Sequence, residues 1–287
     1  MNMIRKFLIK YVLQDWNIAI AQKNDDFSLK EIKWMKHTYK DRWFADPFIV
    51  GDTEDAYIVL AEEYMHKTRL GRLARLTVSK EDCILLKNET ILDIPTHLSF
   101  PNTIAVEGNV YIYPENGAAG NTKYYKYGQE LKMEGVLSEF PLSDATIAEI
   151  NGQYYILATL GEECNGDNLR VYKSDSPLNG YKECQQIRFS DNIARRAGNV
   201  FVCNGQLISP AQVCNNDYGE GVSLQVMEEK NGQISLKEIK RMMPPTKDYP
   251  EGFHTYNVYK NDVVVIDGYR YGSKFLHNVY FKIRKFI

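Results

Sequence analysis

The sequence has few cysteines, and their spacing excludes two common uses. The five Cys residues are an odd number and form no C-x-x-C pair, so neither a disulfide framework nor a zinc site is indicated. A serine nucleophile elbow, a P-loop and a G-x-G-x-x-G fingerprint are also missing, which removes support for the common protease and nucleotide-binding classes. We expect no metal ligands and no cofactor, with a structural cation in a central channel as an open alternative.

Charge of one sign is not concentrated along most of the chain. The sequence has 35 Lys and Arg against 37 Asp and Glu, a net charge of −2, and no basic patch of the kind that binds nucleic acid. We therefore expect no nucleic-acid partner. The 20 Tyr and 12 Phe residues suit half-buried strands, and equally suit rings that stack on sugars.

The N-terminal residues do not resemble a secretory signal. Arg5, Lys6 and Lys10 interrupt a short apolar stretch and no small-residue cleavage site follows, so we expect a cytoplasmic protein. Residues 3–13 also fit a basic amphipathic helix in peripheral contact with a membrane. The alternative is a segment packed against the body of the protein.

One block of sequence recurs five times. Each copy opens where a polar or small residue interrupts an apolar run, and the copies are residues 44–50 (FADPFIV), 100–106 (FPNTIAV), 142–148 (LSDATIA), 196–202 (RAGNVFV) and 254–259 (HTYNVY). Each is followed by a polar turn and a second apolar strand, at residues 57–60, 110–113, 154–157, 206–209 and 263–266. A strand–turn–strand unit repeated about every 50 residues predicts a β-propeller.

We therefore predict an all-β protein, a single five-bladed propeller domain over residues 1–287 with four-stranded antiparallel blades around a central funnel. The predicted blades cover roughly 41–90, 95–137, 140–189, 193–241 and 253–285. Residues 1–40 precede the first blade, and their apolar stretch at 16–21 is a strand that could close the ring by pairing with the last blade. No long helix is expected after residue 15.

Two carboxylates open inner strands, where a propeller lines its funnel. Asp46 opens the first blade and Asp144 opens the third. Glycoside cleavage requires two acids around a sugar-sized cleft. One deprotonates water or attacks the sugar itself, and the other protonates the leaving oxygen. A lone Asp at a strand start is more often a turn cap, but equivalent positions in separate repeats weaken that reading.

Further acids end the second strands of three blades. Glu62 and Glu63 do so in blade one, Glu115 in blade two and Asp267 in blade five. Because the second strand returns along the first, we expect these acids deeper in the funnel or at its other rim, unless the length of their side chains brings them in.

Other polar side chains lie near the block openings. His97 and His254 are candidate hydroxyl donors or general bases, although a structural histidine is the default for either one. Arg195 and Arg196 could clamp a carboxylate or phosphate, or form an ion pair with Asp46 or Asp144. Gln212, at the end of a blade-four strand, and Tyr256, in the last block, are further candidate ligand-binding residues.

The ordered set of motifs resembles a known family. The motifs lie at 45–48, 62–63, 97–101, 114–115, 144–146, 195–198, 209–212, 218–219, 254–256 and 267–268. Their order is similar to the N-terminal domain of glucosamine inositolphosphorylceramide transferase, over roughly residues 16–270. That family resembles in turn the five-bladed propellers of family 43 glycoside hydrolases and their arabinanase, levansucrase and invertase relatives.

The wider resemblance implies roles for some residues. It implies that Asp46 is a general base and that Asp144 tunes and orients the acid. The blade-four Glu that serves as general acid in those hydrolases is absent, and Arg195 and Arg196 stand in that stretch. Either Glu115, Glu62 or a histidine such as His254 protonates the leaving group, or the site binds without cleaving. The two arginines would suit an anionic sugar.

Three functions fit these observations. The first is an enzyme acting at a glycosidic bond of a surface glycan. The second is a non-catalytic glycan-binding module of polysaccharide or glycolipid biosynthesis, working with a partner glycosyltransferase. The third is a sugar transferase that uses the same funnel, since an activated donor needs no blade-four acid.

Overall fold

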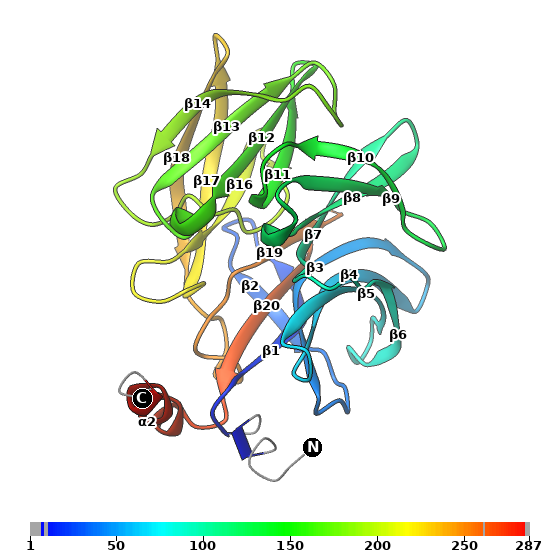
Figure 1. Cartoon of the computed structure of the whole chain (residues 1–287), viewed down its shortest axis with the longest axis vertical. Coiled ribbons are helices and arrows are strands. Elements are labelled where there is room, and N and C mark those ends of the chain that lie inside the picture. The colour runs from blue at the N-terminus through cyan, green and yellow to red at the C-terminus, as the bar shows by residue number, and fades with distance from the viewer. Residues whose placement is uncertain (1–6, 9–10, 261, 285–287) are drawn as a thin grey trace.

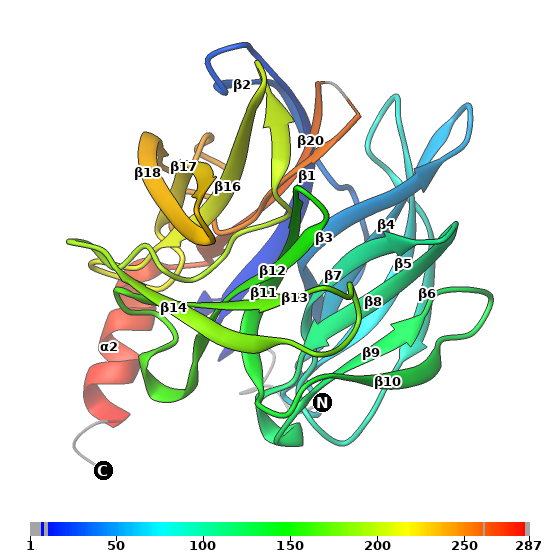
Figure 2. The ribbon, with the colours of Figure 1, turned by 90° about the horizontal axis from the view of Figure 1, so that it is seen from above.

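The protein is a ring of five antiparallel four-stranded sheets around a central axis (Figures 1 and 2). The computed structural model describes residues 7–8, 11–260 and 262–284. The predicted five-bladed β-propeller is confirmed.

The first three blades each run in sequence order. Blade one contains β3 (Arg42–Asp52), β4 (Ala56–Met65), β5 (Leu70–Ser79) and β6 (Leu85–Leu92). Blade two contains β7 (Ser99–Val106), β8 (Asn109–Glu115), β9 (Thr122–Lys126) and β10 (Lys132–Ser138). Blade three contains β11 (Leu142–Ile150), β12 (Gln153–Leu160), β13 (Asn168–Ser174) and β14 (Lys182–Arg188).

Blade four also runs in sequence order, whereas blade five is completed by strands from the N-terminal part of the chain. Blade four contains β15 (Phe201–Cys203), β16 (Gln206–Val213), β17 (Gly221–Lys230) and β18 (Gln233–Met242). Blade five has the order β19 (Tyr256–Tyr259), β20 (Val263–Tyr271), β1 (Gln14–Lys23) and β2 (Leu29–Trp34). The N-terminal residues therefore close the ring as predicted, but with two strands.

The prediction that blade five extends to residue 285 is wrong. Residues after β20 form the helix α2 (Lys274–Arg284), which also corrects the expectation of no long helix. Phe275, Val279 and Ile283 recur at i, i+4 and i+8, a helical period, and β1 and β2 already fill the outer positions of the sheet.

Each pair of neighbouring blades encloses its own hydrophobic core. Between blades one and two, for example, the rings of Phe48 and Phe100 meet edge to face with centroids 5.1 Å apart, alongside Leu60 and Ile112. Four similar clusters fill the other seams of the ring. Burial of one such side chain contributes about 1.5–3 kcal/mol, so the seams hold the blades in fixed relation around the axis.

The inner strands of three blades begin with the same backbone distortion. Asp46, Phe100 and Asp144 have φ values of 51°, 43° and 45°, and the pairing of each inner strand with its neighbour shifts register at that point. A bulge of this kind re-aims side chains, and left-handed backbone costs a non-Gly residue about 1–2 kcal/mol. Strained backbone positions cluster at functional sites, so their repetition around one axis indicates that the funnel is a candidate site.

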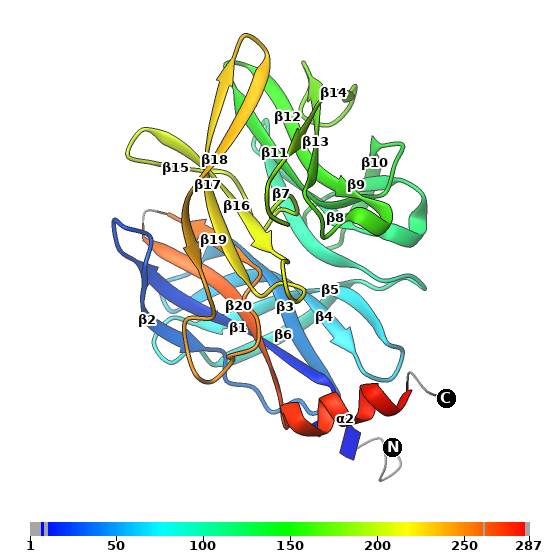
Figure 3. The same ribbon diagram turned by 90° about the vertical axis from the view of Figure 1, so that its left-hand side faces the viewer.

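The two ends of the described chain lie together at one side of the ring (Figure 3). The Ser273 amide donates to the Tyr11 carbonyl at 2.9 Å, and His277 Nδ1 lies 2.8 Å from the Val12 carbonyl. The predicted amphipathic helix over residues 3–13 falls largely outside the described residues. No helix among the described residues has the length and apolar character needed to cross a membrane.

Candidate functional site

The acids at the ends of the second strands lie at the same rim as Asp46 and Asp144. In the antiparallel pairs, Glu62 lies opposite Ala45 and Glu115 lies opposite Ser99. The end of a returning strand adjoins the start of the first strand, so the expectation of a deeper or opposite position was wrong. Five carboxyl groups therefore converge on the axis, those of Asp46, Glu62, Glu115, Asp144 and Asp267.

Glu63 points away from this group. Its carboxylate accepts hydrogen bonds from Arg42 Nη1 and Arg72 Nε, both at 2.7 Å. It therefore stabilises the blade rather than the funnel.

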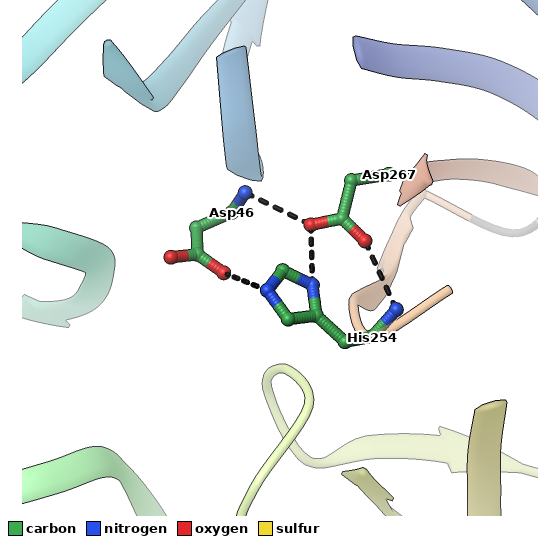
Figure 4. A group of neighbouring side chains, drawn as sticks. All are labelled: Asp46, His254 and Asp267. Carbon is green, nitrogen blue, oxygen red and sulfur yellow. Dashed lines mark hydrogen bonds and ion pairs between the residues drawn. The ribbon is translucent and has the colours of Figure 1, made fainter. Parts of the chain in front are cut away.

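His254 lies between two of the carboxyl groups (Figure 4). Its Nδ1 is 2.7 Å from Asp267 Oδ2, and its Nε2 is 3.6 Å from Asp46 Oδ1. Asp267 Oδ2 also accepts the Asp46 amide at 3.0 Å, and Asp46 Oδ2 accepts the Phe100 amide at 3.0 Å. This series of contacts links blades five, one and two around the axis.

The electrostatics of this trio favour a charged histidine. Burial opposes the charge on His254, but the carboxylates of Asp267 and Asp46 outweigh it and raise its pKa. Burial raises the pKa of Asp46 to about 6, although His254 opposes that shift. Burial would also raise the pKa of Asp267, but His254 and hydrogen bonds overcome it and lower the pKa.

Asp144 is the centre of a second group. Its Oδ2 accepts from Arg195 Nε at 2.6 Å and from Gln212 Nε2 at 2.5 Å, and its amide donates to Glu115 Oε2 at 2.9 Å. Arg195 Nη2 reaches the same Glu115 oxygen at 3.1 Å. Burial raises the pKa of Asp144 to about 7 despite the Arg195 charge.

Glu62 forms a third group with His97. His97 Nδ1 accepts the Gly71 amide at 2.9 Å, so the neutral ring carries its proton on Nε2. That nitrogen lies 3.3 Å from Glu62 Oε1, but the alignment does not make a hydrogen bond, and Oε1 has no partner among the described residues. Burial and the neighbouring acids, first Asp46, raise the pKa of Glu62 well above its ordinary value.

The loop between β16 and β17 covers the funnel. The Tyr218 ring lies over the Arg195 guanidinium at 5.3 Å and meets the His254 ring edge-on at 5.4 Å. On the other side of His254, the Trp16 ring lies 4.3 Å away. Asp46 and Asp144 are only 4% and 1% exposed, so both carboxyl groups are almost fully enclosed.

Two predicted ligand-binding residues lie elsewhere. Arg196 is fully buried, and its guanidinium donates to Ser209, Gln225 and the carbonyls of Ala194 and Ile193. The Tyr256 ring packs in the core between blades four and five. Arg196 therefore stabilises blade four from within, and Tyr256 packs between blades four and five.

The prediction of an anionic ligand rested on the two arginines. Arg195 is engaged as well, by Asp144, Glu115, Asn165 and Cys164. The open alternative of an ion pair to Asp144 is therefore what the structure contains. Sequence reasoning missed two site residues, Tyr218 and Thr255, although both fall within the motifs used for the resemblance. The Thr255 hydroxyl donates to Asp267 Oδ2 at 2.8 Å.

The trio in Figure 4 is also the one cluster of metal-ligating atoms in the described part of the chain, with all ligand atoms within 4.8 Å of one another. The hydrogen bond between His254 Nδ1 and Asp267 uses a nitrogen and an oxygen that a cation would need. A channel cation stays a prediction.

A separate pocket of about 340 Å³ adjoins the rim between blade one and α2. Its walls are mostly aromatic and include Trp43 and Tyr64, whose rings stack at 4.4 Å, and Phe281 of α2. Tyr64 in turn lies 6.3 Å from the His97 ring. The aromatic pocket and the acidic funnel are therefore neighbours.

The fold is a five-bladed β-propeller, and family 43 glycoside hydrolases are among the solved structures that share it. A family 43 β-1,3-galactosidase aligns with 79% of this chain and 57% of its own at 12% identity, with a TM-score of 0.56. A thermostable family-43 glycoside hydrolase aligns over 75% of this chain and 83% of its own at 14% identity, with a TM-score of 0.53. At these identities the likeness shows the fold alone.

Sequence comparison identifies the particular family. The chain belongs to the family described as "Glucosamine inositolphosphorylceramide transferase 1, N-terminal", whose profile matches residues 16–260. Glucosamine inositolphosphorylceramide transferase 1 of Arabidopsis thaliana is 29% identical over 247 residues, covering 74% of this chain and 32% of the relative. The same transferase of Oryza sativa subsp. japonica is 32% identical over 149 residues, covering 48% and 20%. The chain thus spans about a third or less of these relatives.

Proposed function

We propose that the funnel binds a carbohydrate and serves sugar recognition in glycolipid assembly. One observation carries the proposal. Three buried side-chain oxygens at the rim, Glu62 Oε1, Asp144 Oδ1 and Gln212 Oε1, lack a hydrogen-bond donor among the described residues. Unpaired buried acceptors are costly, and a ligand rich in hydroxyl or ammonium donors supplies what they lack.

The charge of the funnel favours a basic sugar over an acidic one. Five carboxyl groups face two cationic side chains, Arg195 and His254. Burial and mutual repulsion raise the pKa values of Asp46 and Asp144, so an ammonium group would be stabilised here and a further carboxylate would not. The relatives' name includes glucosamine, which supports a hexosamine ligand.

Ligand-detected NMR with methyl glycosides tests this proposal. We expect saturation transfer to methyl glucosaminide, weaker transfer to methyl glucoside and none to methyl glucuronide. Asp144→Asn should weaken the signal because it removes the acceptor charge, whereas Asp55→Asn, in an exposed turn, should leave it unchanged. Equal signals from all three glycosides, or from both variants, would contradict it.

Acid–base catalysis is a second candidate, favoured by the raised pKa values. A carboxyl with a pKa of about 6, as in Asp46, can act as a base at neutral pH. Glu62, whose pKa burial raises well above its ordinary value, can hold a proton for a leaving group. Arg195 occupies the stretch where family 43 hydrolases carry their acid. This favours transfer from an activated donor over hydrolysis.

Mass spectrometry of reaction products separates catalysis from binding alone. Wild type and Asp46→Asn would be incubated with glycan acceptors, with and without sugar nucleotides. If the protein is a catalyst, wild type should form a product of new mass. The rate of product formation should fall at least about 10²-fold in Asp46→Asn and stay unchanged in Asp55→Asn. If no new mass forms but glycosides bind in the NMR experiment, the protein binds sugar without catalysis.

A further inference from the structure

The outward face of α2 carries an exposed apolar stripe. Phe275 is 73% exposed, Val279 is 38% exposed and Ile283 is 56% exposed. Their i, i+4, i+8 spacing places them in one row along the helix. Lys282 lies exposed beside this row.

The opposite face of α2 is fixed to the protein. The His277 ring lies 3.9 Å from the Tyr271 ring, and Phe281 lines the aromatic pocket. Lys274, at the start of the helix, pairs with Glu251. The apolar stripe is therefore held outward, beside the described residues of the N-terminal segment, where Phe7 is 48% exposed.

The sequences of the two chain ends are basic, whereas the rest of the chain is acidic. Residues 1–13 and 274–287 together contain seven basic residues and no acidic one. Removing those seven from the 35 Lys and Arg leaves 28 against 37 Asp and Glu, a net charge of −9 for the remaining 260 residues. Arg5, Lys6, Lys10 and Lys285 each lie within two positions of a described residue.

We propose that α2, together with the described N-terminal residues beside it, forms a surface that docks this protein on an anionic lipid bilayer. An exposed apolar row flanked by basic residues is the pattern of helices that lie in the membrane interface. A strongly acidic remainder would be repelled by such a bilayer, so the basic ends fix which side faces it. The aromatic pocket borders this surface, which places it and the funnel near lipid-borne sugars.

Vesicle flotation tests the docking without reference to sugar binding. The full chain would be mixed with vesicles of phosphatidylcholine alone, or of equal parts phosphatidylcholine and phosphatidylglycerol. We expect flotation with the anionic vesicles only, and loss of it at high salt because the charges are exposed.

Matched variants locate the surface. Phe275→Ser should weaken binding about ten-fold, since one buried Phe is lost from the membrane interface, whereas Phe140→Ser, 57% exposed on blade two's edge, should not. Lys282→Gln should weaken binding about five-fold, and Lys237→Gln, exposed on β18, should not. Circular dichroism melting curves confirm that each variant is folded.

Two results would overturn the proposal. One is no flotation of the folded wild type with anionic vesicles. The other is flotation that Phe275→Ser and Lys282→Gln leave unchanged. If the wild type instead self-associates in light scattering and Phe275→Ser abolishes this, the surface binds a second copy of the chain.

Discussion

At the scale of single residues, the same carboxylates build the ring and line its axis. The distorted amides of Asp46, Phe100 and Asp144 donate to Asp267, Asp46 and Glu115 respectively, each from the preceding blade. Charge-assisted hydrogen bonds of this kind are about twice as strong as neutral ones. They offset the cost of left-handed backbone, so the geometry that aims Asp46 and Asp144 at the axis is held by other site residues.

The raised pKa of Asp144 predicts a pH-dependent stability. Between the ordinary value of 3.8 and about 7, the folded protein binds this proton more tightly than the unfolded chain, so stability falls as pH rises. The slope from one group is at most about 1.4 kcal/mol per pH unit. Denaturant unfolding of wild type and Asp144→Asn from pH 4 to 8 measures this slope. The free energy of unfolding of wild type, relative to that of Asp144→Asn, should fall as pH rises. A pH-independent difference would count against it.

The pair between His254 and Asp267 predicts a second residue-scale effect. Asp267→Asn leaves the buried His254 charge with only Asp46, which should cost about 3 kcal/mol of stability and lower the His254 pKa. The control is Asp262→Asn, because Asp262 is exposed and pairs with Lys23 at 3.6 Å, an arrangement worth less than about 1 kcal/mol. Urea unfolding and histidine NMR titration measure the two effects, and equal losses in both variants would refute the prediction.

At the scale of elements, the loop carrying Tyr218 depends on one glycine. Gly219 has φ of +59°, and a Cβ there would lie 2.7 Å from His254 Cβ. Gly219→Ala should therefore destabilise the protein by about 1–3 kcal/mol more than Gly205→Ala. Gly205 has a φ of +75° but no atom within 4 Å of a Cβ, so it isolates backbone strain from the clash. Thermal unfolding of both variants gives the difference, and similar values would show that the cover does not press on His254.

The strands of this fold could be predicted from sequence, but the positions of some ends could not. The block repeat predicts the inner strands and their second strands because period and turn are local. The repeat does not reveal which segments occupy the two outer positions of the last sheet. These positions are occupied by β1 and β2, and residues 274–284 form a helix instead. Asp267 was visible as an acid, yet its place at the rim follows only once the antiparallel register is applied.

The directions in which the site side chains point could not be predicted from the sequence. Arg195 and Arg196 are adjacent in sequence, but one joins Asp144 at the axis and the other fills a core with Ser209 and Gln225. Tyr256 turns into a core cluster, while Tyr218 lies over the funnel. Packing between blades decides these directions, and no local pattern encodes it.

At the scale of the whole molecule, the ring separates two surfaces by charge and chemistry. One is the acidic funnel beneath Tyr218, and the other is the exposed apolar row of α2, which lies near the described N-terminal residues (Figure 3). The family to which the chain belongs is named for a sugar transfer to a lipid. The proposed sugar site beside the proposed bilayer-facing surface would suit such a substrate.

Calorimetric titration with methyl glucosaminide near pH 6, in two buffers of different ionisation enthalpy, tests the central claim most directly. An ammonium bound among Asp46, Asp144 and Glu62 stabilises their charged forms, so we predict that binding releases protons and that Asp144→Asn both weakens binding and reduces the release. Binding without proton release, or binding that Asp144→Asn leaves unchanged, would show that the sugar does not occupy the funnel.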